Sequence, residues 1–178
     1  FNINTTSINF DSYGVSGVTA SLGNLNITGA STTSVRTGRS PNGGVFTLTT
    51  GTVTLAAASR LYMFLDMTAT INYTSADWNL QGDFFVTSSV TGAFSSNVTV
   101  NGNVTINMLG GATRFDINYA AAGAAENVTF TVTGNTTVTN AKGWFHMVDG
   151  GTGTLNFTTT NLTLTDGVSN ILSQATGA

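Results

Sequence analysis

The chain has 178 residues, of which only 7% are charged and none is cysteine, and its formal net charge is −3. So few cations exclude a basic surface for nucleic acid, and the lack of cysteine excludes disulfides, zinc ribbons and thiol nucleophiles. A hydrophobic content of 40% argues against intrinsic disorder, and no apolar run is long enough to predict a membrane-spanning helix. The length predicts one domain.

Polar residues without charge dominate the surface chemistry of the chain. It holds 34 Thr, 19 Asn, 15 Ser and 21 Gly. Thr favours pleated, half-buried strands, whereas Gly and Asn favour turns. This composition predicts an all-β protein coated with hydroxyl and amide groups.

Apolar and polar residues alternate with a period of two along most of the chain, which predicts strands. In chain order the expected strands are Phe1–Phe10, Val15–Thr28, Val45–Leu55, Arg60–Tyr73, Trp78–Thr91, Asn97–Met108, Arg114–Ala121, Asn127–Thr139, Gly143–Val148, Gly153–Thr165 and Val168–Leu172. The Asp166-Gly167 pair predicts a tight hairpin turn between the last two. Ala56–Met67 could form a short helix, but we expect a turn followed by a strand buried on both faces.

About ten strands in one domain predict an Ig-like or jelly-roll β-sandwich. A β-solenoid is the rival fold, because Asn97–Gly111 resembles one rung of such a coil. Solenoids carry repeats of fixed length, and we found no repeat of that kind, so we favour the sandwich.

The most informative motif is Asn-x-Thr, which occurs well above the number that the frequencies of Asn and Thr give by chance. It begins at Asn4, Asn26, Asn72, Asn97, Asn103, Asn127, Asn135, Asn156 and Asn161. This is the acceptor sequence for N-glycosylation, which predicts an extracellular glycoprotein. Composition alone is the competing explanation.

In seven of these triplets the middle residue is apolar or aromatic, as in Asn97-Val98-Thr99. In a strand, residues i and i+2 share one face. We therefore expect Asn and Thr to face solvent and the middle side chain to enter the core. The first residue is Phe1 rather than Met, from which we expect a processed chain whose targeting signal has been removed.

Catalytic residues are scarce, and we predict that the chain is not an enzyme. His146 lies in an apolar segment, and Glu126 is the only Glu. Asp77 and Asp83 flank Trp78, a spacing that is weak evidence for a glycosidase. No cofactor is expected besides N-linked glycans. Calcium is not excluded, because Asp149 and Asp166 precede Gly residues in turns.

The single Lys, Lys142, lies just before Gly143-Trp144. Lysines in apolar surroundings form isopeptide bonds in some extracellular β-domains, and Glu126 could be the assisting acid. An exposed Lys at the start of a strand is the simpler interpretation.

The N-terminal segment carries no charge before Asp11 and holds four large apolar residues, Phe1, Ile3, Ile8 and Phe10. A free β-prone segment of this kind is an aggregation hazard. It either pairs within its own domain or inserts into a neighbouring subunit as a donor strand. We expect the second, with residues 1–12 as the arm, residues 13–178 as the head domain, and the four apolar residues as anchors.

Taken together, these features resemble subunits of archaeal extracellular filaments that assemble by donor-strand complementation, with the thread filaments of Sulfolobus-like archaea as the nearest likeness. The resemblance implies an Ig-like head domain, a head-to-tail homopolymer and roles in surface adhesion and biofilm. The alternative is a non-polymerising surface-layer or adhesin module that binds carbohydrate through Trp78 or Trp144. Neither hypothesis involves nucleic acid or a membrane span.

Overall fold

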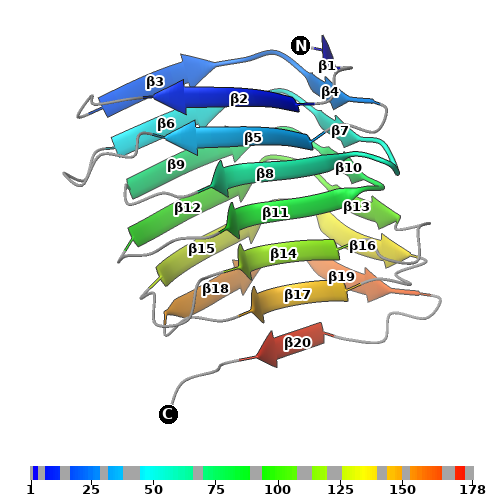
Figure 1. The fold of residues 1–178 in the computed structure, drawn as a ribbon. Coiled ribbons are helices and arrows are strands. Elements are labelled where there is room, and N and C mark those ends of the chain that lie inside the picture. Colours follow the sequence, from blue (N-terminus) through cyan, green and yellow to red (C-terminus); the bar gives the residue numbers. More distant parts are fainter. Residues whose placement is uncertain are drawn as a thin grey trace.

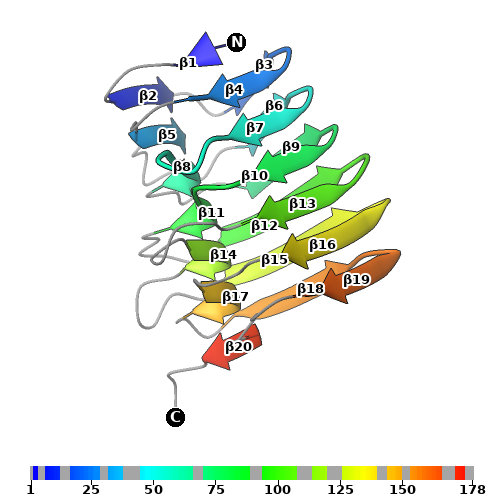
Figure 2. The same cartoon turned by 90° about the vertical axis from the view of Figure 1, so that its right-hand side faces the viewer.

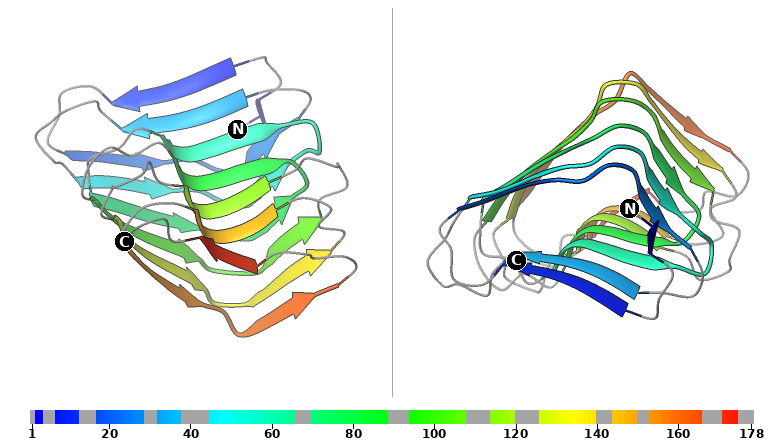
Figure 3. Two further views of the ribbon diagram at one scale, coloured as in Figure 1. Left: turned by 60° about the horizontal axis from the view of Figure 1, so that its bottom comes forward. Right: turned by 90° about the horizontal axis from the view of Figure 1, so that it is seen from above.

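The computed structural model of the chain is a parallel β-solenoid. It describes residues 2–3, 7–12, 17–28, 32–37, 45–65, 70–88, 94–107, 114–119, 126–139, 144–149, 153–165 and 171–174. The strands fall into three sheets, here called A, B and C, and the chain passes through them in that order again and again (Figure 1). Seen from above, the three sheets surround a common interior (Figure 3).

Each sheet is a stack of strands contributed by successive coils. Sheet A contains β1 (Asn2–Ile3), β4 (Leu25–Ile27), β7 (Val53–Leu55), β10 (Trp78–Leu80), β13 (Val104–Asn107), β16 (Asn135–Thr139) and β19 (Asn161–Leu164). Sheet B contains β2 (Ser7–Ser12), β5 (Thr32–Thr37), β8 (Arg60–Leu65), β11 (Asp83–Ser88), β14 (Arg114–Tyr119), β17 (Trp144–Asp149) and β20 (Ile171–Gln174). Sheet C contains β3 (Gly17–Ser21), β6 (Val45–Thr49), β9 (Thr70–Ser75), β12 (Phe94–Val100), β15 (Glu126–Val132) and β18 (Thr154–Thr158).

The predicted Ig-like or jelly-roll sandwich is therefore wrong, although the all-β composition was interpreted correctly. Every strand pair among the described residues is parallel, whereas both predicted folds consist of antiparallel strands. The expected hairpin at Asp166-Gly167 fails for the same reason. β19 pairs with β16 in sheet A and β20 pairs with β17 in sheet B, so the two strands are not partners.

Several predicted strands are in fact two strands joined by a sharp bend. The expected strand Asn97–Met108, for example, contains β12 and β13, which belong to different sheets. The bend lies at Asn101-Gly102-Asn103, and similar short segments join sheet C to sheet A in the other coils (Figure 2). The alternation of polar and apolar residues continues through the bend, which is why the sequence pattern gives no warning of it. At Ala56–Met67 the expected turn before a strand is confirmed, but burial on both faces is wrong, because buried Leu61 and Met63 alternate with exposed Arg60 and half-buried Tyr62.

The N-terminal segment does not act as a donor strand. β1 pairs with β4 of the next coil, with Asn2 opposite Asn26 and Ile3 opposite Ile27. β2 pairs with β5 over its whole length, from Ser7 opposite Thr32 to Ser12 opposite Thr37. Two of the predicted anchors, Ile8 and Phe10, thus lie in a strand of the chain's own first coil, and Phe1 lies outside the described residues. Each of the two strands is thus paired on one side within its own domain, and each forms the end of its sheet.

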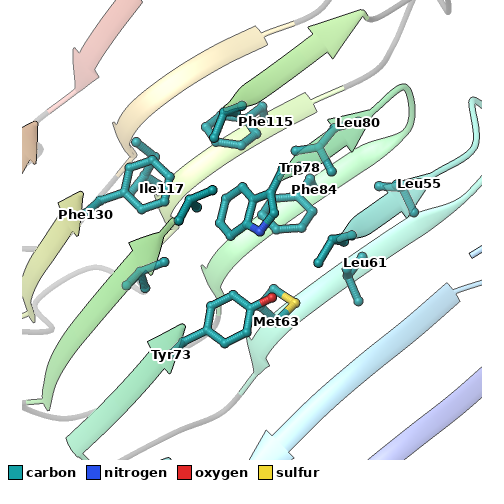
Figure 4. Packing of buried hydrophobic residues seen from close by; sticks show 14 of the residues in the cluster. Leu55, Leu61, Met63, Tyr73, Trp78, Leu80, Phe84, Phe115, Ile117 and Phe130 are labelled. Carbon is teal, nitrogen blue, oxygen red and sulfur yellow. The ribbon is translucent and has the colours of Figure 1, made fainter. Parts of the chain in front are cut away.

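The core is a continuous stack of inward side chains that runs along the solenoid. Leu55, Ile71, Val98 and Ile106, among others, are almost completely buried. Trp78 lies near the middle of the stack, with Phe84 and Phe130 at ring-centroid distances of 4.8 Å and 5.3 Å and Tyr73 at 6.1 Å (Figure 4). Each coil therefore packs its inward residues on those of the coils above and below.

A ladder of polar side chains holds the bends between sheets C and A, which we call the C–A corner. Asn24 Oδ1 accepts a hydrogen bond from the amide of Thr52 at 3.0 Å, and Asp77 Oδ1 accepts one from the amide of Asn103 at 2.6 Å. Asn103 Oδ1 in turn accepts the amide of Asn135 at 3.0 Å, and Asn161 Nδ2 donates to Asn135 Oδ1 at 2.8 Å. The corner residue of one coil thus satisfies the backbone of the next.

Glycine is required beside this ladder. A Cβ at Gly134 would lie 2.5 Å from the carbonyl oxygen of Gly102 and 2.6 Å from Asn103 Oδ1. A Cβ at Gly51 or Gly102 would collide with the corner side chain of the preceding coil, Asn24 or Asp77. The Gly-Asn pairs Gly23-Asn24, Gly102-Asn103 and Gly134-Asn135 therefore lie at bends between sheets, although the strands predicted from the sequence run through them without a break.

We expect Gly134→Ala to destabilise the protein by about 1–3 kcal/mol, the usual cost of forcing extra volume into a packed site. Asn103→Ala should cost about 1 kcal/mol, because it removes one hydrogen bond to the Asn135 amide at an exposed position. Urea unfolding measures both, and Gly23→Ala is the matched control, since nothing lies within 4 Å of a Cβ there. Equal losses in Gly134→Ala and Gly23→Ala would contradict this account of the corner.

Tyr73 makes the fold sensitive to alkaline pH. Burial raises the pKa of its phenol to about 12, although its hydroxyl shares a 2.8 Å hydrogen bond with Thr50 Oγ1. The unfolded chain loses this proton near pH 10 while the folded chain keeps it, so this contribution to stability is complete below pH 10 and disappears as pH rises to 12. The difference amounts to about 3 kcal/mol. Over this pH range the free energy of unfolding of Tyr73→Phe should fall less steeply than that of the wild type, which urea unfolding at a series of pH values measures.

Candidate ligand-binding face on sheet B

The three sheets differ sharply in charge. The described strands of sheet A contain no charged residue, and those of sheet C contain only Glu126. Sheet B collects the remaining charged strand residues and the single His: Asp11, Arg36, Arg60, Asp83, Arg114, Asp116, His146 and Asp149. One of the three sheets therefore holds nearly all the charged residues of the described strands.

Strand register groups these residues into rows that run across sheet B. Thr32, Arg60 and Asp83 are successive partners in β5, β8 and β11. Phe84 pairs with Phe115, so Asp83 and Arg114, which precede them, occupy the same row. Arg114 in turn pairs with Trp144. We call this the charged row.

A second row lies two residues further along the strands. Its members are Ser34, Tyr62, Phe85, Asp116, His146 and Leu172, each the register partner of the next. We call it the mixed row. The two rows together place aromatic, acidic and basic residue types at adjacent positions on one sheet.

The best-described part of this face is an ion pair supported by an aromatic ring. Arg60 donates from Nε at 2.9 Å and from Nη2 at 2.6 Å to Oδ2 of Asp83. Its guanidinium carbon lies 5.9 Å from the centre of the Tyr62 ring, and Nη1 lies 3.4 Å from the Tyr62 hydroxyl. The hydrogen bond to Asp83 is the main cause that raises the pKa of Arg60, so the guanidinium stays charged at any physiological pH. The Arg60 side chain remains 48% exposed, and it is therefore accessible to a ligand.

Asp116 lies in the same sheet, but its side chain is buried. It occupies the mixed row between Phe85 and His146, yet it is completely buried. Its neighbours in β14, Phe115 and Ile117, are buried as well. A carboxylate is rarely buried without a structural or chemical role, because removal from water is costly.

The structure decides the role of one of the two tryptophans that were predicted to bind carbohydrate. Trp78 is 0% exposed in the core and cannot stack on a ligand, so it does not bind carbohydrate. Trp144 lies at the end of the charged row on sheet B. Asp77 and Asp83 do not form a pair of carboxylates around Trp78, since Asp77 holds the C–A corner and Asp83 binds Arg60.

Eight of the nine predicted sequon asparagines lie in described segments, and Asn4 lies outside them. Asn26 and Asn72 are half-buried, and the other six are exposed: Asn97, Asn103, Asn127, Asn135, Asn156 and Asn161. The residues between Asn and Thr face the core in most triplets, as Val98, Val104 and Val128 do, whereas Leu162 is exposed. Sheet A and its corner carry Asn26, Asn103, Asn135 and Asn161, and sheet C carries the other four.

Lys142 and Asp166 lie outside the described residues. Glu126 and Asp149 lie in β15 and β17, on different sheets. Within the described ranges, no group of three His, Cys, Asp or Glu side chains is arranged to hold a metal ion. No helix in that part of the chain is long and apolar enough to cross a membrane.

Comparison with known proteins gives no relative. No protein-family model, no curated protein and no solved structure matches the chain.

The rows on sheet B were not recognised from the sequence. Their members lie 23 to 31 residues apart, and coils of unequal length hide the repeat. Gly-Asn pairs mark only three of the six C–A corners, at Gly23-Asn24, Gly102-Asn103 and Gly134-Asn135, so they signal the coils incompletely.

Proposed function

We propose that the chain is a secreted surface module that binds carbohydrate on the outer face of sheet B. The supporting observation is the concentration of Arg, Asp, His and aromatic residues in the strands of that sheet, with exposed Arg60 bound to Asp83 beside Tyr62, while the described strands of sheets A and C hold one charged residue, Glu126. Sugars are bound by aromatic faces together with side chains that donate and accept several hydrogen bonds, and these residue types meet in the charged and mixed rows. This is the surface-module alternative in which Trp144, and not Trp78, contributes.

The filament hypothesis is not carried forward. It required a free N-terminal strand as the joint between subunits, and β1 and β2 are already paired inside their own domain. An Ig-like head domain, which the resemblance to thread filaments implied, is absent as well, because the fold is a solenoid. A module that displays one chemically distinct face needs no polymer to function.

A panel of neutral and acidic oligosaccharides, titrated against the purified chain, tests this proposal. We expect at least one ligand to change the tryptophan emission, and Trp144→Phe to lose that change because Trp78 is buried. Tyr62→Ala and Arg60→Ala should weaken binding by about tenfold or more, equivalent to ~1.4 kcal/mol. Thr105→Ala, on the outer face of sheet A, is the matched control and should bind normally. Absence of binding across the panel, or unchanged affinity in Tyr62→Ala, would refute the proposal.

We further propose that N-glycans stand on sheet A and the C–A corner. A corner asparagine has strands on fewer sides than one in the middle of a sheet, and Asn103, Asn135 and Asn161 are all exposed there. Glycopeptide mapping of chain secreted from a glycosylating host should therefore find glycans among Asn26, Asn103, Asn135 and Asn161. Unmodified asparagine at all four sheet A positions would contradict the proposal.

A further inference from the structure

Sheet C presents a second, different surface, built from a repeated triplet. In each of its six strands two outward positions, separated by one inward residue, hold Thr or Asn first and Thr or Ser second. The six triplets are Thr19-Ala20-Ser21, Thr47-Leu48-Thr49, Asn72-Tyr73-Thr74, Asn97-Val98-Thr99, Thr129-Phe130-Thr131 and Asn156-Phe157-Thr158. We call the outward residues of these triplets the sheet C array.

Strand pairing aligns the array into two columns. One column runs from Thr19 through Thr47, Asn72, Asn97 and Thr129 to Asn156. The other runs from Ser21 through Thr49, Thr74, Thr99 and Thr131 to Thr158. No shift of register interrupts these pairings, in contrast to the bulge between β17 and β20 in sheet B.

The array is therefore a two-dimensional lattice of hydroxyl, amide and methyl groups. Adjacent members of a column are separated by one strand spacing, about 4.8 Å, and the two columns by two residues of a strand, about 6.7 Å. Each Thr presents one hydroxyl group, which donates and accepts hydrogen bonds, beside one methyl group, which does neither. A surface of this kind fixes water at regular intervals without attracting ions.

The same face lacks the groups that would recognise other partners. Its only charged strand residue is Glu126, at the start of β15, so an anionic polymer has no cation to bind. The aromatic residues of the triplets point inward, with Tyr73 and Phe130 each 1% exposed and Phe157 half-buried in the edge strand β18, so the array itself has no outward ring for stacking on a sugar or a base. The ligand that remains is one whose own surface repeats at molecular intervals and offers only hydrogen bonds, and solid water is such a ligand.

We propose that the sheet C array binds ice. Strands fixed by a parallel ladder hold the hydroxyl and methyl groups in place before contact, so ordering of the interfacial water costs less entropy than on a mobile surface. Twelve outward side chains in six strands add many weak contacts, each of which is small alone. This inference is independent of the carbohydrate-binding proposal, because it uses a different sheet and a different ligand.

Inhibition of ice recrystallisation by chain produced without glycans tests the inference. The wild type should suppress the growth of ice crystals, and Thr99→Tyr, which raises a bulky ring from the middle of a column, should abolish this activity. Thr105→Tyr places the same ring on the outer face of sheet A and should retain it. Circular dichroism and thermal unfolding should show that both variants fold, since Tyr is well tolerated in strands.

A conservative series separates the chemistry of the array from its shape. Thr99→Val keeps the methyl groups and the strand propensity, and we expect it to retain more activity than Thr99→Tyr. Activity equal to the wild type in Thr99→Tyr, or no activity in the wild type, would overturn the inference. The inference would also be overturned if the chain showed no ice activity but bound microcrystalline cellulose, and Thr99→Tyr removed that binding. A polysaccharide would then be the ligand. Glycans on Asn72 or Asn97 in native material would cover the array and would also overturn it.

Discussion

Parallel stacking at a single strand spacing is the constraint on which the structure depends. In a solenoid every outward residue has the same position of the neighbouring coils directly above and below it, at about 4.8 Å. Like charges at that distance repel each other, whereas Thr on Thr and Asn on Asn form hydrogen bonds. Columns of uncharged polar residues are therefore the simplest sequence that this geometry permits, which accounts for a chain with 7% charged residues.

Sheet B shows how charge is accommodated under the same constraint. Arg60 has Asp83 as its register partner, and Asp11 has Arg36. Opposite signs alternate along the charged row, so each charge has a favourable neighbour in the adjacent coil. A surface ion pair of this sort contributes only about 0.2–1 kcal/mol to stability. Its presence on one face therefore suggests a role in recognition and does not explain the stability of the fold, which comes from the apolar stack and the C–A corner.

Much of the local structure could be predicted from the sequence, whereas the architecture could not. Alternation with a period of two identifies strands, and it places Val98 inward and Asn97 outward, because it depends only on neighbouring residues. The choice between sandwich and solenoid depends on which strands pair. The Gly-Asn pairs at Gly102-Asn103 and Gly134-Asn135 mark two of the bends, but corners such as Ala76-Asp77 lack such a pair, so no short motif signals the coil. The sequence offered two explanations for the excess of Asn-x-Thr, N-glycosylation and composition. The columns of Asn and Thr in sheets A and C give a third, structural explanation, which the sequence alone did not suggest.

The connections between the sheets differ in one respect that bears on how such a chain can change. Two or three residues join sheet C to sheet A in every coil, as at 76–77 and 101–103, whereas the segments between sheets A and B range from 81–82 to 108–113. The first kind is held by the Asn and Gly ladder and varies by only one residue. The second kind already varies in length while the strands on either side keep their register. Insertions and deletions should therefore accumulate beside sheet B, where they would reshape the edges of the charged face and leave the stack of coils intact.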